Sequence, residues 1–532
     1  MRTAARHGAG HFSVPPVIAI GVVLLVSAFA LGYLVCDQGW YRPVMQFLRT
    51  SISAPEFALP ALFKRSEIPV LYMDIAFDDY QYLVEQRARA LELGAYRVDG
   101  DSSVPAVATA AQASPVAVTI SLLEGPAQVF ADNSWAFQIT ANADEALLGV
   151  RWATLVPVDV DALLTSGYLE ALHQDGFAVP AYSFVNLTIN GHPWGLYAFE
   201  ELPSLSLLDD HADNSKSVLV FFDSEDFLTA SIELGEAPLV ESFAYAEVAM
   251  ATSRGLSREQ RSEGLRNDDA LAVLEHEAFD SLMALMDGSL PPSAVFDPEQ
   301  MGRFWAHTTF WRGTPFLDWS TLCLAYSSET RHFEPIGNGY SSIPGTALPK
   351  LFLNDPQIQH AYVRELSRFR SAVDLPALAS ADLETLYLSM GVDLGYPVSF
   401  KQLIEARRAW IQHFLTPSQT VRAEVVNLGD ALTVNLANLQ SLPVEVLGLD
   451  LGENAFLPLD PAWVDANDQS ALVDTSGNLV LRALSGDIPR FLTLRIPHDL
   501  LPQAQGEIRL ATRLWGMEEG VTFVVVKDGI SE

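Results

Sequence analysis

Two adjacent carboxylates, Glu200 and Glu201, stand where a strand-like stretch of the sequence ends. Carboxylate oxygens are the ligands that hard divalent cations such as Mg²⁺ prefer, so the pair is a candidate cation site. The alternative is that both side chains are solvated at the end of a core hairpin, because acidic residues are mostly exposed in proteins. Both interpretations require the preceding residues to form a strand that delivers the pair to its end.

The stretch before the pair reads FVNLTINGHPWGLYAFEE (184–201) and predicts a two-stranded hairpin. Val185, Leu187 and Ile189 alternate with polar residues, as in a half-buried strand. The dipeptide Asn190-Gly191 predicts the turn, because a type I′ turn needs a positive φ at both central residues. The residues after the turn then form the returning strand.

This hairpin and the helix-like block DIAFDDYQYLVEQRARALELG (74–94) resemble the CotH family, the spore-coat-H-like atypical protein kinases. The resemblance extends from about Ile68 to Tyr340 and is closest to the membrane-anchored branch of Gram-negative bacteria. It implies an α+β fold, with an atypical kinase-like (CotH-like) mixed domain over residues 67–416. It also implies ATP and Mg²⁺ as the cofactors of an active member.

The positions at which the family places cations for phosphate differ in this chain. Glu124 in TISLLEGP stands where the family has a lysine, and Gln138 in SWAFQIT stands at a family basic position. The next block, PVDVDALL, contains Asp159 and has no arginine. The resemblance leaves Arg151 and Lys216 as the candidate cofactor-binding residues, and the alternative for Arg151 is a structural role.

The later block FLDWSTLCLAYSSETRHFEPIGNGY (316–340) carries the other candidate residues. Asp318 matches the aspartate of the family's Asp-Trp pair and is the candidate catalytic base, with a turn aspartate as the alternative. Asn338 falls near the aspartate that the family has after its EPI triplet. Glu200, Glu201 and Asn338 are therefore the candidate metal ligands, with Asn338 offering a neutral oxygen. A magnesium–triphosphate site with one certain carboxylate would be poor, because Mg²⁺ favours anionic oxygens.

Composition excludes several functions. The net charge of −34 disfavours binding to nucleic acid. The near absence of lysine bears on phosphate chemistry, which usually uses a lysine as a point charge. The two cysteines, Cys36 and Cys323, cannot form a disulfide framework or a CxxC metal site. The chain has no Walker A loop, GxSxG, HExxH or Rossmann glycine pattern.

A helix is predicted to begin at Asp297-Pro298. His307 lies on the apolar face of this helix and is interpreted as a core histidine rather than a metal ligand.

Residues 17–36 are uncharged and long enough to cross a bilayer as a helix. Arg2 and Arg6 precede them, so the positive-inside rule places residues 1–16 in the cytoplasm. Residues 37–66 are a juxtamembrane connector. The alternative is a signal peptide cleaved after Ala30, which leaves the body on the same side. We expect a single-pass protein of the cytoplasmic (inner) membrane, with its body in the periplasm or outside the cell.

The hydrophobic pattern of the sequence changes after Thr416-Pro417. Short apolar runs such as 431–436, 444–449 and 491–496 are separated by turn residues from there on. This pattern predicts an all-β, sandwich-like domain over residues 419–532.

Three functions are compatible with these observations. The leading hypothesis is a non-catalytic, pseudokinase-like binding or scaffold protein, which needs no cofactor and whose partner is an unknown envelope protein or glycan. The second is an active ATP- and Mg²⁺-dependent kinase that uses Asp318 as its base. The third is a surface protein that binds a glycan or a protein through the C-terminal β domain, and exposed aromatic residues on one sheet face would favour it.

Overall fold

The structure is a computed structural model that describes residues 68–96, 102–110, 113–126, 135–142, 145–202, 217–220, 269–312, 322–339, 355–371, 400–427, 431–452, 455–464, 470–484, 489–501 and 508–528. The predicted cytoplasmic tail, transmembrane helix and connector lie outside these residues. Within the described part, no helix has both the length and the apolar character needed to cross a membrane. From Ile68 onward the chain forms one compact unit of helices and many strands, which confirms the predicted α+β class.

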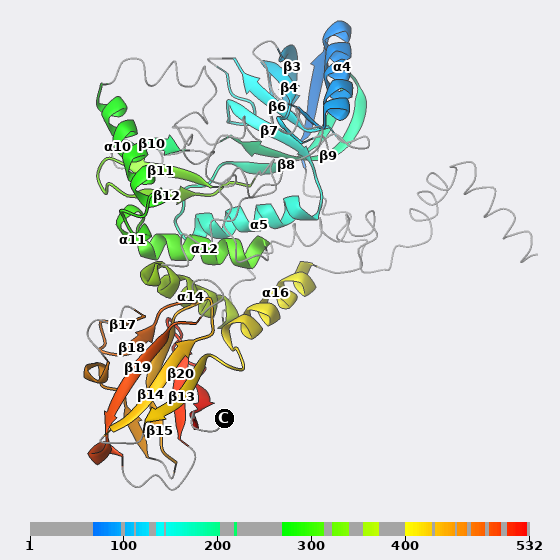
Figure 1. Cartoon of the computed structure of the whole chain (residues 1–532). Coiled ribbons are helices and arrows are strands. Elements are labelled where there is room, and N and C mark those ends of the chain that lie inside the picture. Colours follow the sequence, from blue (N-terminus) through cyan, green and yellow to red (C-terminus); the bar gives the residue numbers. More distant parts are fainter. Residues whose placement is uncertain are drawn as a thin grey trace, which may run out of the picture. The chain divides into compact units, whose positions relative to one another are not determined.

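The first part of this unit is a closed β-barrel (Figure 1). Around the barrel the strands are ordered β1 (Val70–Ile75), β3 (Val104–Ala110), β4 (Val116–Leu122), β6 (Phe137–Ala141), β7 (Trp152–Pro157), β9 (His192–Glu201) and β8 (Tyr182–Ile189). Strands β1 and β8 pair in parallel and close the ring. Side chains alternate between the two faces of each strand, so every second residue fills the barrel core.

The helix α4 (Phe77–Leu93) follows β1 and packs against β3 and β4. It ends at Gly94, whose φ of 82° lies in the left-handed region, as the sequence predicted. The short strands β2 (Ala95–Tyr96) and β5 (Gly125–Pro126) pair with each other beside the barrel.

A helical layer follows the barrel (Figure 1). Its helices are α5 (Val160–Gln174), α10 (Asp269–Met286), α11 (Pro292–Val295), α12 (Pro298–Arg312), α14 (Pro356–Ser371) and α16 (Phe400–Leu415). A small sheet accompanies them and contains β10 (Ser217–Val220), β11 (Cys323–Ser327) and β12 (Phe333–Ile336). Asp297 accepts a hydrogen bond from the Gln300 N–H at 2.8 Å, so α12 has the predicted capped start.

Helices α12 and α14 approach each other closely at Gly302. A Cβ at this position would lie 2.5 Å from the Ala361 Cβ and 2.7 Å from the Ile358 carbonyl oxygen, so only glycine fits. This crossing brings side chains of α12 and α14 within reach of the end of α5, which also packs on α12.

The C-terminal part is built from two sheets. One contains β19 (Phe491–Pro497), β14 (Ala431–Asn438), β13 (Val421–Asn427) and β22 (Lys527–Asp528). The other contains β17 (Ala471–Val473), β18 (Leu479–Leu481), β15 (Val444–Asp450), β20 (Arg509–Leu514) and β21 (Thr522–Val525), with β16 (Phe456–Pro458) beside β15. The short helices η6 (Pro461–Trp463) and η7 (His498–Leu500) lie in the connections. Inward residues of both sheets share one hydrophobic core, which also contains residues of α5, α12, α14 and α16.

Candidate functional site

The predicted hairpin forms, and it helps to close the barrel. Strands β8 and β9 pair antiparallel across Asn190 and Gly191, whose φ angles of 49° and 77° are those of the predicted turn. The Asn190 Oδ1 accepts a hydrogen bond from the Ile75 N–H at 2.8 Å. The turn is therefore fastened to the end of β1, the strand that pairs with β8.

A row of polar side chains crosses the outer wall of the barrel. Inter-strand pairing connects Ser121 to Gln138, Gln138 to Thr154, Thr154 to Glu200, and Glu200 to Tyr182. The residues before and after Gln138 and Thr154 lie in the barrel core, so the row faces outward. We call these five residues the polar row. It contains one carboxylate, one amide and three hydroxyl groups.

Glu200 is the buried acid of the polar row, with 5% of its surface exposed. Its Oε1 accepts a hydrogen bond from the Gly339 N–H at 2.8 Å. A Cβ at Gly339 would lie 2.4 Å from the Thr165 Cγ2 and 2.8 Å from the Glu200 Oε1. The chain itself therefore fills the space beside this carboxylate, from α5 on one side and from the segment after β12 on the other.

Tyr182 lies at the end of the polar row, against α5. Its hydroxyl donates a hydrogen bond to the Ala162 carbonyl oxygen at 3.0 Å. Burial raises the pKa of Tyr182, and the negative charges of Glu200 and Asp159 raise it further. Tyr182 is thus a hydrogen-bond donor that fixes the start of α5 on the barrel.

Glu201 does not share a face with Glu200. It pairs with Ala153, whose side chain lies in the barrel core, whereas Glu200 pairs with Thr154 on the outer wall. The Glu201 Oε2 accepts a hydrogen bond from the Ala181 N–H at 3.0 Å. The two carboxylates therefore do not converge on one cation, because consecutive residues of a strand point to opposite sides of the sheet.

The other candidates are placed separately. The Arg151 guanidinium lies 4.5 Å from the ring centroid of Trp152, which is a cation–π contact at the start of β7. Asn338 is partly buried and directly precedes Gly339, so its segment lies beside Glu200. Asp318 and Lys216 lie outside the described residues. Of the candidate site residues, the structure thus brings together Glu200 and the segment of Asn338.

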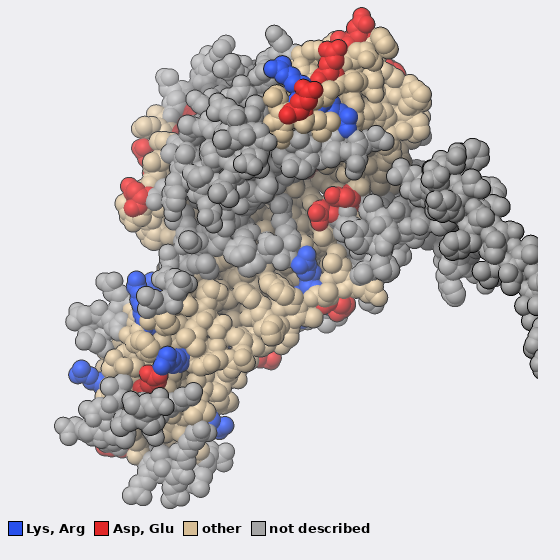
Figure 2. Space-filling model, turned by 45° about the vertical axis from the view of Figure 1, so that its right-hand side comes forward, with Lys and Arg blue, Asp and Glu red and all other residues tan. Residues whose placement is uncertain are grey.

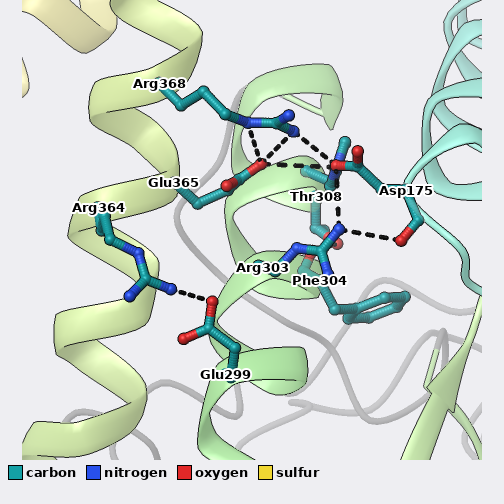
Figure 3. Close-up of polar contacts among 9 residues, drawn as sticks. Asp175, Glu299, Arg303, Phe304, Thr308, Arg364, Glu365 and Arg368 are labelled. Carbon is teal, nitrogen blue, oxygen red and sulfur yellow. Dashed lines mark hydrogen bonds and ion pairs between the residues drawn. The ribbon is translucent and has the colours of Figure 1, made fainter.

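A second group of charged residues joins α5, α12 and α14 (Figure 3). Asp175, directly after α5, accepts a hydrogen bond from Arg368 at 2.6 Å and lies 2.6 Å from the His307 Nε2. Arg368 also donates from Nε to Glu365 at 2.8 Å, and Arg303 donates to the Asp175 carbonyl oxygen at 2.9 Å. We call these five residues the charge cluster. His307 is 2% exposed, as expected for a core histidine.

The charge cluster has the spacing of a metal site but the charges of an ion-pair network. Ligand atoms of Asp175, His307 and Glu365 lie within 4.8 Å of one another. The two carboxylates, however, already face the guanidinium groups of Arg303 and Arg368. A divalent cation would have to displace Arg368 from both carboxylates, so the charges favour a structural role for the cluster.

The pKa of Asp175 reflects this balance. Burial alone would raise it, but the hydrogen bond and charge of His307, together with the charges of Arg368 and Arg303, lower the pKa to about 2. The cluster therefore stabilises the ionised form of Asp175 and so holds three helices together.

Sequence reasoning placed His307 in the core but missed its charged partners. Asp175 and Arg368 are 193 residues apart in the chain, so no local pattern connects them. The one available signal was the i,i+3 spacing of Glu365 and Arg368 on an amphipathic helix, which predicts a pair but not its third member.

Charges on the face of the molecule in Figure 2 lie singly or in small groups among uncharged residues. Nucleic-acid binding would require a broad basic surface. Among the described residues on this face, the basic side chains do not form one.

A scan of the chain against models of known protein families finds no match, and a search of curated proteins finds none either. The resemblance to the CotH family therefore rests on the sequence blocks themselves.

Proposed function

We propose that this chain is a non-catalytic, CotH-like binding or scaffold protein of the cell envelope, held at the cytoplasmic membrane by residues 17–36. The polar row is the observation that carries the proposal. It includes Gln138, which stands at a basic position of the family, and the buried carboxylate of Glu200. A triphosphate on this wall would meet a negative charge where a kinase offers positive ones.

The close packing of the chain around the Glu200 carboxylate supports the same proposal. The Glu200 carboxylate accepts the Gly339 N–H, and Gly339 has no room for even one additional carbon atom. A magnesium ion needs several oxygen ligands arranged around it, and Glu201 cannot add one because it faces the other side of the sheet. The proposed protein therefore works without ATP or Mg²⁺, and its partner is an envelope protein or a glycan.

A titration of the full chain in detergent with ATP and Mg²⁺ tests the proposal. We expect no saturable binding at micromolar nucleotide by calorimetry, and no shift of the thermal unfolding midpoint at the same concentrations. A single cooperative unfolding transition in the same sample shows that the protein is folded. Saturable binding in the micromolar range that depends on Mg²⁺ would end the proposal.

The second candidate function, an ATP-dependent phosphotransferase, is favoured by one observation. The fold brings Glu200 beside the segment of Asn338, and both are candidate metal ligands. A matched pair of variants separates the two functions. If the chain transfers phosphate, Glu200→Gln should abolish the transfer and Glu201→Gln, on the opposite face, should leave it unchanged. Under the leading proposal neither the wild type nor either variant transfers phosphate from ATP.

A further inference from the structure

The outward face of the β15–β20–β21 sheet carries two half-exposed phenylalanines. Phe456 on β16 is 51% exposed and Phe523 on β21 is 50% exposed. Asp450 pairs with Phe456 on one side and with Arg509 on the other, while Ala511 pairs with Phe523. These residues face outward, because the residues that alternate with them lie in the hydrophobic core, namely Leu449, Leu510 and Val524.

Between the two rings the sheet carries only small side chains. Gly448 pairs with Ala511, and both residues are buried, with 1% of Ala511 exposed. A Cβ at Gly448 would lie 2.5 Å from the Phe456 Cζ and 2.8 Å from its Cε1, so the ring extends across β15 instead of standing away from it. Strands β16 and β21, which carry the two rings, are separated by three strand spacings, about 14 Å. The two rings therefore offer exposed apolar surfaces that one extended ligand can span.

A charged pair lies beside the rings. The Arg509 Nη2 donates a hydrogen bond to the Asp450 Oδ2 at 2.5 Å, and its guanidinium lies 5.2 Å from the ring centroid of Phe523. We call Gly448, Asp450, Phe456, Arg509, Ala511 and Phe523 the aromatic strip. Its one negative and one positive charge balance, in a chain whose net charge is −34.

We infer that the aromatic strip binds a neutral polysaccharide chain. The C–H faces of sugar rings are apolar and pack on aromatic rings, while their hydroxyl groups exchange hydrogen bonds with a carboxylate and a guanidinium. Charge argues against anionic polymers and lipid surfaces as occupants. Anionic polymers are repelled by the rest of the chain, and a lipid surface is bound by faces that are rich in Lys and Arg. This inference goes beyond the proposed function, because it concerns the β domain and not the polar row.

Affinity electrophoresis of the full chain, in native gels that each contain one polysaccharide, tests the inference. The probes are two neutral β-glucans, hydroxyethylcellulose and laminarin, with heparin as the anionic control. The detergent must carry no sugar headgroup, since such a headgroup would compete. We expect at least one neutral glucan to retard the chain and heparin not to. Retardation by neither glucan, or stronger retardation by heparin, overturns the inference.

A variant with both Phe456→Leu and Phe523→Leu keeps the apolar bulk of the strip but removes its flat rings. We expect it to bind the retarding glucan at least tenfold more weakly. The matched control is Phe491→Leu on β19, which removes a ring of 43% exposure from the other sheet and should leave binding unchanged. Equal binding by the double variant and the wild type overturns the inference, as does an equal loss in the control.

Sedimentation velocity of the same proteins tests the rival occupant, a second copy of the chain. We expect the wild type and the double variant to sediment alike. Conversion of an oligomer into a monomer by the two substitutions would assign the strip to a contact between copies and would overturn the polysaccharide assignment.

Discussion

At the residue scale, Asp175 shows how a half-buried charge can stabilise this fold. Its pKa is lowered from the ordinary 3.8 to about 2, because His307, Arg368 and Arg303 outweigh the effect of burial. The folded protein therefore binds this proton less readily than the unfolded chain does. The resulting stability is present above about pH 4 and is lost as the pH falls toward 2. The shift corresponds to roughly 2 kcal/mol.

We expect Asp175→Asn to lower the free energy of unfolding by about 2 kcal/mol at pH 7. The difference from the wild type should shrink as the pH falls from about 4 to about 2, because the wild-type carboxyl is then protonated as well. Urea unfolding of both proteins at a series of pH values measures this difference. The matched control is Glu299→Gln, which breaks an exposed ion pair with Arg364 and should cost less than about 1 kcal/mol. A difference that stays constant down to pH 2 would show that packing, not charge, is responsible.

The residue scale also separates what the amino-acid sequence can predict from what it cannot. The period-two alternation that identified the hairpin core already implies that Glu200 and Glu201 face opposite sides of the sheet. The alternation alone therefore argues against a cation site shared by the two carboxylates. The contact of Glu200 with Gly339 has no such local signal, because it joins residues 139 positions apart. Local patterns report which face a residue occupies but not which distant segment covers it.

At the element scale, α14 contacts both the central part of the chain and the C-terminal strands. Glu365 and Arg368 on it belong to the charge cluster, and His360 packs on the Trp515 ring with 4.4 Å between ring centroids. Gly516, with a φ of 110°, lies so close to α14 that a Cβ would be 2.6 Å from the His360 carbonyl oxygen. The turn after β20 is thus docked on the backbone of α14 itself.

We expect Gly516→Ala to destabilise the protein more than Gly520→Ala. Both positions have a positive φ, which costs an alanine roughly 1–2 kcal/mol. At Gly516 the new methyl group also meets the backbone of α14, whereas at Gly520 the nearest atom is the Cε of Met517, the end of a flexible side chain. Overpacking against backbone should add about 1–3 kcal/mol at Gly516 only. Denaturant unfolding measures both variants, and equal losses would contradict a docked turn.

At the scale of the whole molecule, periodicity predicted the classes of structure but not how they join. The short apolar runs after Thr416 correctly predicted strands such as β14 and β15. Packing nevertheless continues across that point, because Leu415 of α16 and Val421 of β13 belong to the same hydrophobic core. The sequence pattern likewise could not predict that β1 and β8 close the barrel, because their parallel pairing joins strands that are far apart in the sequence.

This continuity predicts that the helical layer and the β domain unfold together. Buried residues of α12 and α14 share one core with those of both C-terminal sheets, whereas the barrel has a core of its own. In native-state hydrogen exchange followed by mass spectrometry, we expect the amides of α12 and of β14 to exchange with the same free energy of opening. The barrel amides serve as the internal reference, because a separate core allows a separate opening. If β13 to β21 opened at a free energy several kcal/mol below that of α12, the boundary after Thr416 would separate two independently stable domains, and the shared core would contribute little to holding them together.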